Sequence, residues 1–259
     1  MRIDRERVFE AFALYTGRYD SGDEKIKLKI DHTYRVSELC ERIAKAQGLT
    51  EEETEISWLT GMLHDIGRFE QLRNYNTFND ALSVNHAQYG ADILFLEGKI
   101  KEYISDFSEN ELIEKVIRLH NTYRLPDSLS KRERVLSEIL RDADKIDILK
   151  VNVEVPLEEI YNITTKELRN AAVTDEVMES IREGHATVRS LKRTAADHLV
   201  GHISLVFELV FPVSFRIVKE QGYLEKLMEF QSENRETQLR FEEIRKLMKR
   251  FMEERTGEQ

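Results

Sequence analysis

Four histidines and two aspartates are the residues of this chain whose types and spacing best suit chemistry: His32, His64, Asp65, His86, His120 and Asp144. The histidines fall on or near the apolar faces of four separate predicted helices. For example, Val36 and Leu39 follow His32 by four and seven residues and share its helix face. Burying an imidazole or a carboxylate on such a face is costly unless the group is paired or bound to a metal. One metal centre shared by all six residues explains their positions.

Six candidate ligands exceed what one tetrahedral metal site needs, and they suit two metal ions bridged by a carboxylate. Asp65 is the natural bridge because it directly follows His64. A single histidine on an apolar face is more often a core residue, and an isolated His-Asp pair can be a hydrogen-bonded core pair, so the interpretation depends on the complete set. Imidazole-rich ligation favours iron, manganese, cobalt, nickel or zinc over magnesium. His185, His198 and His202 are interpreted as core or supporting residues outside this set.

The His-Asp doublet lies near the end of the predicted helix around which the chain is organised. Thr50 and Glu53 form a capping box that begins this helix. Gly67 suits its end, and residues 69–82 have the composition of a polar loop whose aromatic side chains could form one wall of a site. The doublet is therefore expected where the helix enters the core.

The remaining candidates lie on four further predicted helices. These helices cover residues 24–47 with His32, residues from Ser83 onward with His86, residues 108–122 with His120, and residues 131–150 with Asp144. Ser108 and Glu111 form a second capping box. Gly90 either lets another backbone approach closely or thins its helix for packing. Asp144 is expected on the side occupied by Leu136 and Leu140, because the three recur every four residues.

Composition predicts an all-α protein, because the 259 residues include only 3 prolines and 11 glycines. We expect a single helical domain over residues 1–259, with a core at about 18–150 that holds the candidate ligands and a C-terminal extension at about 151–259 packed on it. The elements predicted within the extension are a turn and short helix at 156–162, a long helix over 189–217 bent near Pro212, and an amphipathic helix over 233–254.

Charge and apolar patterning restrict the location and partners of the protein. The net charge of −10, without a long Lys/Arg run, argues against general affinity for nucleic acid or membranes. The single Cys40 fits a reducing compartment. The apolar run 199–215 contains Glu208 and Pro212 and is interpreted as a buried helix, and residues 1–7 lack the core of a signal peptide. We expect a cytoplasmic protein, whose C-terminal amphipathic helix packs internally or forms a homodimer.

The candidate residues resemble the HD superfamily of metal-dependent phosphohydrolases over about residues 18–150. The signature of that superfamily, His, then His-Asp, then Asp, corresponds to His32, His64-Asp65 and Asp144. The additional pair, His86 and His120, resembles the binuclear members of the superfamily, such as the HD-GYP cyclic-dinucleotide phosphodiesterases.

Finer comparison of the motifs separates this chain from the HD-GYP enzymes. Arg68 corresponds to the lysine that contacts phosphate in their His-Asp-x-Gly-Lys segment. However, Asn121 follows His120 where those enzymes often have a second histidine, and a Gly-Tyr-Pro motif is absent, which argues against cyclic-di-GMP as substrate. The segments 17–20, 64–71, 83–94 and 141–149 resemble more closely a group of bacterial HD hydrolases without an assigned substrate.

The resemblance implies an all-α HD-domain bundle that hydrolyses the phosphoester of a small phosphorylated substrate, a nucleotide or a metabolite, as a phosphomonoesterase or a phosphodiesterase. One divalent transition-metal ion is expected on His32, His64, Asp65 and Asp144, and a second on Asp65, His86 and His120. Two such cations acidify a water between them, and this water attacks phosphorus in line. The predicted catalytic residues are Asp65, Arg68 and Lys145. The predicted substrate-binding cations are Arg68, Lys145, Arg35 and Arg118.

Two other functions fit the same residues. The ligand set also resembles the HD-fold di-iron oxygenases, such as myo-inositol oxygenase, in which two irons activate O₂. Oxygen-dependent turnover with iron, and none with manganese, would favour that class. A non-catalytic regulatory module with a vestigial site would bind a nucleotide without turning it over with any divalent metal.

Overall fold

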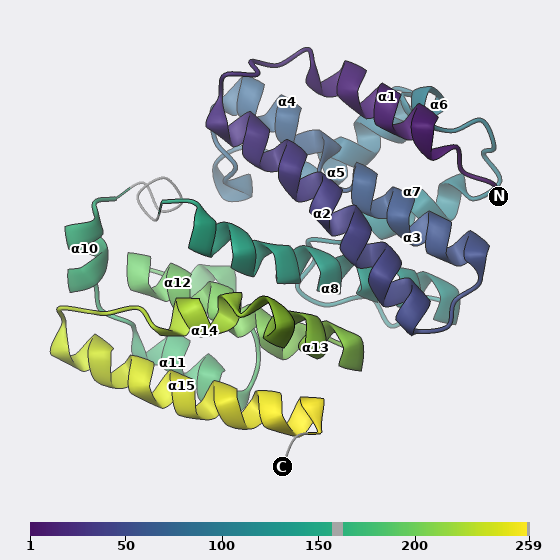
Figure 1. Ribbon diagram of the computed structural model, residues 1–259. Helices are drawn as coiled ribbons and strands as arrows, with labels where there is room; N and C mark the ends of the chain where they lie inside the picture. The colour runs from purple at the N-terminus through teal and green to yellow at the C-terminus, as the bar shows by residue number, and fades with distance from the viewer. Residues whose placement is uncertain (157–162, 258–259) are drawn as a thin grey trace. The chain divides into compact units, whose positions relative to one another are not determined.

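The computed structural model describes residues 1–156 and 163–257, and every regular element within them is helical (Figure 1). This finding confirms the all-α prediction. The turn and short helix predicted between Pro156 and Asn162 fall outside the described residues. Contacts divide the chain into two compact units, Met1–Ala143 and Asp144–Gln259. The boundary lies inside one continuous helix, α8 (Lys131–Glu154), and the packing of the C-terminal extension on the core stays a prediction.

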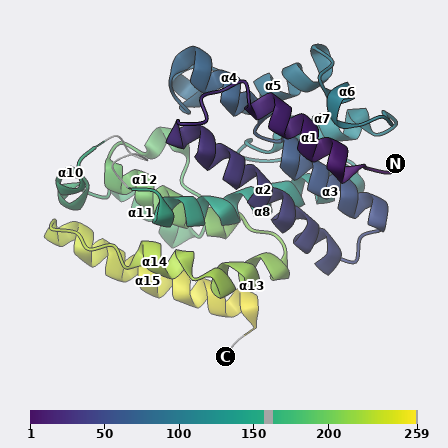
Figure 2. The ribbon, with the colours of Figure 1, turned by 45° about the horizontal axis from the view of Figure 1, so that its top comes forward.

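The first unit holds the candidate metal ligands on short and long helices. Its elements before α8 are α1 (Arg5–Thr16), α2 (Glu24–Ala46), α3 (Glu51–Leu63), α4 (Ile66–Tyr75), η1 (Asp80–Leu82), α5 (His86–Ala91), η2 (Asp92–Leu96), α6 (Ile100–Tyr103) and α7 (Asn110–Leu119). Helices α2 and α3 lie side by side (Figures 1 and 2). A Cβ on Gly61 of α3 would lie 2.6 Å from the Cα of Ser37, so the small residue permits this close contact.

The helix break at the His-Asp doublet differs from the expected exit into a loop. Helix α3 begins with the predicted capping box and ends at Leu63, but a new helix, α4, begins at Ile66 and continues to Tyr75. The prediction of a polar loop over 69–82 is therefore wrong for its first half. Ile66, Phe69 and Leu72 are buried at helical spacing, and this apolar face stabilises α4 although most of its other residues are polar.

Two predicted helix starts are also displaced. Helix α5 is capped by Asn85, whose side chain accepts from the backbone N–H of Ala87, and not by Ser83. Helix α7 begins at Asn110, and the backbone N–H of Ser108 donates to Asp106 outside the helix. Asparagine and serine both cap helices well, so local composition alone did not select the correct cap.

A close contact between α4 and α5 explains the two glycines near the doublet. A Cβ on Gly67 would lie 2.3 Å from the carbonyl oxygen of His86 and 2.6 Å from the backbone nitrogen of Gly90. Gly67 is therefore a packing residue inside α4 and not the end of a helix. The close backbone approach anticipated at Gly90 occurs, and it brings His86 next to the doublet.

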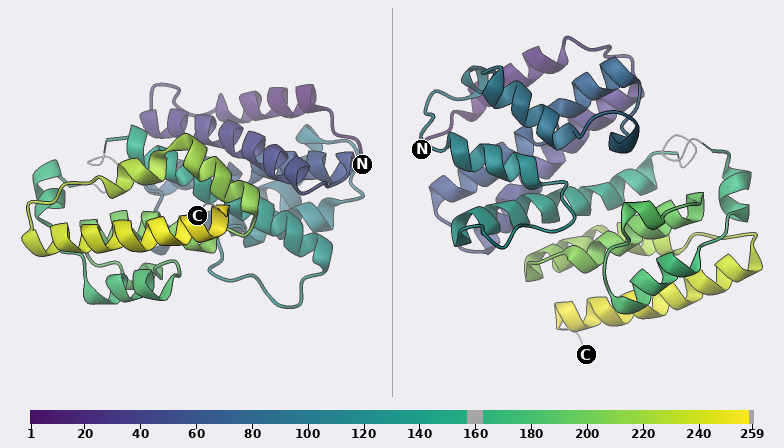
Figure 3. Two further views of the ribbon diagram at one scale, coloured as in Figure 1. Left: turned by 60° about the horizontal axis from the view of Figure 1, so that its bottom comes forward. Right: turned by 180° about the vertical axis from the view of Figure 1, so that it is seen from behind.

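The second unit consists of short helices and one long C-terminal helix (Figure 3). Its elements after α8 are α10 (Thr165–Asn170), α11 (Asp175–Glu183), η3 (Arg189–Leu191), α12 (Ala195–Ile203), η4 (Ser204–Glu208), α13 (Pro212–Gln221), α14 (Tyr223–Met228) and α15 (Arg235–Thr256). The long helix predicted over 189–217 is thus several separate segments. The apolar face of α15, with Phe241, Ile244 and Met248, is buried, and α15 packs on α11, α13 and α14. No helix in the described residues is long and apolar enough to cross a bilayer.

Acid sensitivity of folding is expected from His202 in α12. Burial lowers the pKa of His202 from 6.5 to about 3, and Lys192 lowers it further in the same direction. Between these pH values the unfolded chain binds a proton at His202 that the folded chain does not, so the free energy of unfolding decreases as pH falls from 6.5 toward 3. We expect a loss on the order of 2–4 kcal/mol. Thermal melts across this pH range should show that the melting temperature of His202→Gln changes less with pH than that of the parent. An equal change in the two proteins would contradict the role of His202.

Candidate metal centre

The first unit brings five of the six predicted ligands into one buried cluster. His32 lies on α2, His64 follows α3, Asp65 precedes α4, His86 begins α5 and His120 follows α7. Their exposed fractions lie between 0% and 4%. Four imidazoles and a carboxylate gathered in one interior region require compensation for the lost hydration.

Asp65 lies at the centre of this cluster and turns each of its oxygens toward a different pair of histidines. Its Oδ2 lies 3.6 Å from the Nε2 atoms of both His32 and His64. Its Oδ1 lies 3.4 Å from Nε2 of His86 and 3.9 Å from Nε2 of His120. The carboxylate thus stands between two imidazole pairs, in the position that a bridging ligand needs.

Hydrogen bonds on the far side of the His64 and His120 rings fix which nitrogen faces the cluster. Nδ1 of His64 lies 2.7 Å from the carbonyl oxygen of Gly61, and Nδ1 of His120 lies 2.7 Å from that of Ile117. A carbonyl can only accept, so each Nδ1 carries the proton, and in the neutral ring Nε2 presents a lone pair. Metal-binding histidines show this arrangement, in which the second nitrogen donates to a carbonyl or carboxylate.

The donor set fits a metal ion better than a network of hydrogen bonds. Nε2 of His86 lies 2.9 Å from Nε2 of His120, while Nδ1 of His86 donates to Asp80 at 2.7 Å. Burial lowers the pKa of His86 to about 4, with Arg68 acting in the same direction, so this ring is neutral near pH 7. Two lone pairs then face each other, and a bound cation would satisfy both.

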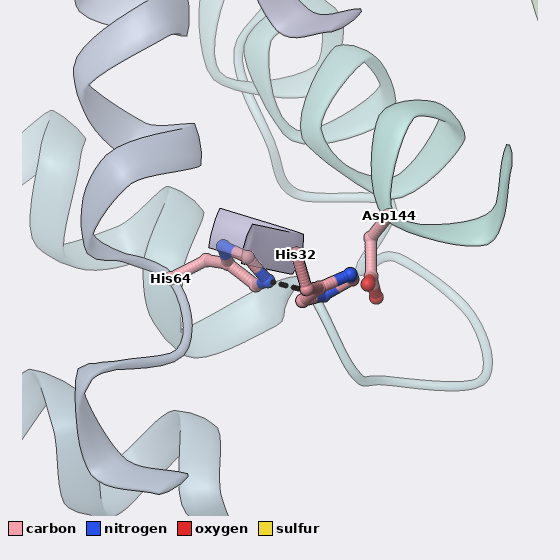
Figure 4. A group of neighbouring side chains, drawn as sticks. All are labelled: His32, His64 and Asp144. Atoms are coloured by element: carbon pink, nitrogen blue, oxygen red, sulfur yellow. Dashed lines mark hydrogen bonds between the residues drawn. The ribbon is translucent and has the colours of Figure 1, made fainter. Parts of the chain in front are cut away.

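Asp144 joins the cluster from α8. Single ligand atoms of His32, His64 and Asp144 all lie within 4.8 Å of one another, as do those of His64, Asp65 and His120. Figure 4 shows the Asp144 carboxylate beside the His32 imidazole, whose Nε2 lies 3.3 Å from that of His64. Asp144 directly follows Ala143, the last residue of the first unit, on the same uninterrupted helix.

Comparison with known families agrees with this geometry. Residues 30–151 match the HD domain family. These residues form an HD domain. HD domains bind divalent metal ions, and the clustered His and Asp side chains of this chain could hold such ions. The matched residues overlap the core predicted at about 18–150, whose bounds stay a prediction.

One characterised relative shares a short segment with this chain. The 3'3'-cGAMP-specific phosphodiesterase 1 of Vibrio cholerae is 41% identical over 46 residues, which is 18% of this chain and 11% of that protein. The chain thus spans only a small part of the length of this relative. No solved structure matches the chain.

Two residues beside the HD doublet were missing from the sequence interpretation. Nζ of Lys29 lies 2.7 Å from Oδ2 of Asp65. Burial raises the pKa of Asp65, but the nearby charge of Lys29 and the contributions of His64 and Arg68 outweigh burial, so the pKa lies well below its usual range. Lys29 precedes His32 by one helical turn, a spacing that could have identified it. Asp80, the acceptor for His86, has no comparable signal in the sequence.

The predicted cations occupy different environments in the structure. Arg68 donates through Nη1 to Oδ1 of Asp80 at 2.8 Å and to the carbonyl of Phe78 at 2.7 Å, and its Nε lies 3.6 Å from Oδ1 of Asp65. Arg118 pairs with Asp92, at 2.7 Å, and with Glu114, so acidic side chains already hold its guanidinium. All four cations are half-buried, with Arg35 on α2 and Lys145 on α8. The substrate contacts of all four cations stay predictions.

Replacing Asp80 with asparagine is expected to weaken metal binding without removing a predicted ligand. The carboxylate of Asp80 fixes the proton of His86 on Nδ1, and loss of such a supporting group typically costs about 10- to 100-fold in metal affinity. Metal titration should show this loss. Asp92→Asn removes a carboxylate that pairs with Arg118 instead, and it should retain the parental affinity. Equal affinities of Asp80→Asn and the parent would contradict the supporting role.

Proposed function

We propose that this HD protein is a metal-dependent phosphohydrolase with two divalent transition-metal ions, which cleaves the phosphoester of a small phosphorylated substrate. The observation that carries the proposal is Asp65, because each of its oxygens faces a separate pair of histidine Nε2 atoms at 3.4–3.9 Å. This arrangement is what a carboxylate bridge between two metal ions requires. Asp144 adds a second carboxylate on the His32 and His64 side.

In this proposal metal ions supply acidified water and neutralise charge on the phosphoryl group. The protein contributes preorganised positions. The carbonyls of Gly61 and Ile117 hold two imidazoles in the required tautomer, and Asp80 does the same for His86. Two divalent ions would be only half neutralised by Asp65 and Asp144, because the neutral imidazoles carry no charge. An anionic substrate would then meet a net positive site, which favours binding and stabilises charge that develops on the phosphoryl oxygens.

The comparisons support hydrolysis as the reaction class. HD domains are generally hydrolases, and the relative from Vibrio cholerae is named as a phosphodiesterase. Its cyclic-dinucleotide substrate is a property of that protein, with which this chain shares only 46 aligned residues. We therefore propose a nucleotide or phosphorylated metabolite as the substrate class, and a mono- or diester as the bond.

A substrate panel tests the proposal. The full chain, reloaded with manganese, is incubated with nucleotides, cyclic dinucleotides and sugar phosphates, and products are followed by phosphate release and chromatography. Hydrolysis of any class supports the proposal. A blank panel with a fully metal-loaded protein contradicts it, and oxygen consumption by the iron-loaded protein would then assign the site to O₂ chemistry. Nucleotide binding without turnover would instead indicate a regulatory module.

A further inference from the structure

Lys29 is the cation closest to the centre of the site, and the proposed mechanism does not yet use it. It lies on α2, one turn before His32, and its side chain is 16% exposed. Its Nζ contacts Oδ2 of Asp65 at 2.7 Å, which is the oxygen that faces His32 and His64. The ammonium therefore lies against the carboxylate that the proposed metal ions share.

A lysine and a metal ion compete for this oxygen. Positive charges a few ångströms apart in a buried site repel each other by several kcal/mol at an effective dielectric constant near 20. A metal ion between His32 and His64 would consequently drive the ammonium of Lys29 away from Oδ2. Lysine is suited to such a shift, because its charge is carried on a flexible four-carbon chain with three rotatable donors.

The aromatic ring of Phe78 limits where the displaced ammonium can go. Nζ of Lys29 lies 5.5 Å from the centroid of this ring, and the guanidinium carbon of Arg68 lies 5.8 Å from it. Both distances permit a cation–π attraction. The half-buried Phe78 thus lies beside both cations that approach Asp65, and Asp80 already anchors Arg68.

We propose that Lys29 is a substrate-binding residue whose ammonium turns from Asp65 to a phosphoryl oxygen when metal ions are bound. The inference rests on the proposed function, because it assumes an anionic phosphoryl group at the metal centre. Asp65 and Asp144 offset only half of the charge of two divalent cations. The ammonium of Lys29 adds a further positive charge beside them, and a bound anion would compensate for it. The rival role is a permanent counter-ion that only stabilises Asp65.

Phosphate binding separates the two roles without relying on turnover. The manganese-loaded full chain is titrated with inorganic phosphate by calorimetry for the parent, Lys29→Met, Lys29→Arg and Lys27→Met. Lys27 is the matched control, because it lies two residues away on the same helix, is exposed and pairs with Glu24. Metal content and circular dichroism are measured for each protein.

Substrate binding by Lys29 predicts a specific pattern. Lys29→Met should retain its helical signal, bind manganese at least as tightly as the parent, and lose phosphate affinity by about tenfold or more, as expected for a charge-assisted hydrogen bond. Lys29→Arg should restore part of the affinity, and Lys27→Met should match the parent. If a substrate is found, Lys29→Met should also raise KM more than the control does.

Unchanged phosphate affinity in a folded, metal-loaded Lys29→Met would overturn the inference and leave the counter-ion role. If that variant does not fold, amine acetylation of the manganese-loaded parent tests the same point. Phosphate should protect Lys29 and not Lys27 from acetylation. Equal acetylation of Lys29 with and without phosphate would overturn the inference. Failure of the proposed function is distinguishable, because a blank substrate panel combined with Lys29-dependent phosphate binding would reject hydrolysis and retain the binding role.

Discussion

Asp65→Ala should leave the protein without bound metal and without measurable turnover, a decrease in activity of about a thousandfold or more. The physical reason is that one carboxylate faces both imidazole pairs, so its loss removes a ligand from each proposed metal position at once. Substitution of a single histidine would weaken one position only. Full activity of a folded Asp65→Ala protein would reject the shared-carboxylate arrangement.

The measurement combines metal analysis by mass spectrometry with phosphate release. Asp31→Ala is the matched control, because it removes an exposed carboxylate from α2 next to His32 and should change neither quantity. Removing Asp65 also leaves Lys29 without its buried counter-ion, which costs about 3–5 kcal/mol of stability. If the alanine variant folds poorly, Asp65→Asn is tested in its place. It preserves the side-chain shape and should show the same loss of metal.

Gly67→Ala is expected to destabilise the fold by about 2–3 kcal/mol and to lower metal content, although glycine to alanine normally stabilises a helix. The added Cβ would lie 2.3 Å from the carbonyl oxygen of His86 and 2.6 Å from the backbone nitrogen of Gly90. Both neighbours are backbone atoms, which cannot move without shifting all of α5. His86 begins α5, so the same shift withdraws its Nε2 from Oδ1 of Asp65.

Urea denaturation and metal analysis test this expectation. Gly22→Ala serves as the control, because a Cβ there would meet only the flexible side chain of Asp20, 3.1 Å away, at an exposed turn. Parental stability of Gly67→Ala would mean that α4 and α5 can separate at little cost. Loss of stability with full metal content would show that His86 does not depend on this contact.

The candidate ligands could be found in the sequence because their signal is local. His32 and the residues four and seven positions later share one face of a helix, and Thr50 and Glu53 meet within a single turn to form the cap of α3. Such patterns depend on neighbours within a few residues. They survive in any tertiary arrangement, so the all-α class and the buried faces followed from them.

The course of the chain after the doublet was misjudged because its stabilising contacts are distant. Residues of α4 are mostly polar, and the sequence favoured a loop. In the structure Gln71 is buried, and its Nε2 donates to Ser83 at 2.8 Å and to Asp80 at 3.0 Å. A buried, fully bonded amide is no penalty to a helix, but its partners lie 9 and 12 residues away and have no periodic relation to it.

The sequence by itself determined the helical class, the doublet and the set of candidate metal ligands. Tertiary structure alone decided that the two oxygens of Asp65 face different histidine pairs, and that Lys29 and Asp80 stand beside them. Periodicity specifies which face of a helix is buried, but not which helix covers it. That choice depends on close backbone contacts such as Gly67 with Gly90, where the absence of a side chain sets the distance between helices.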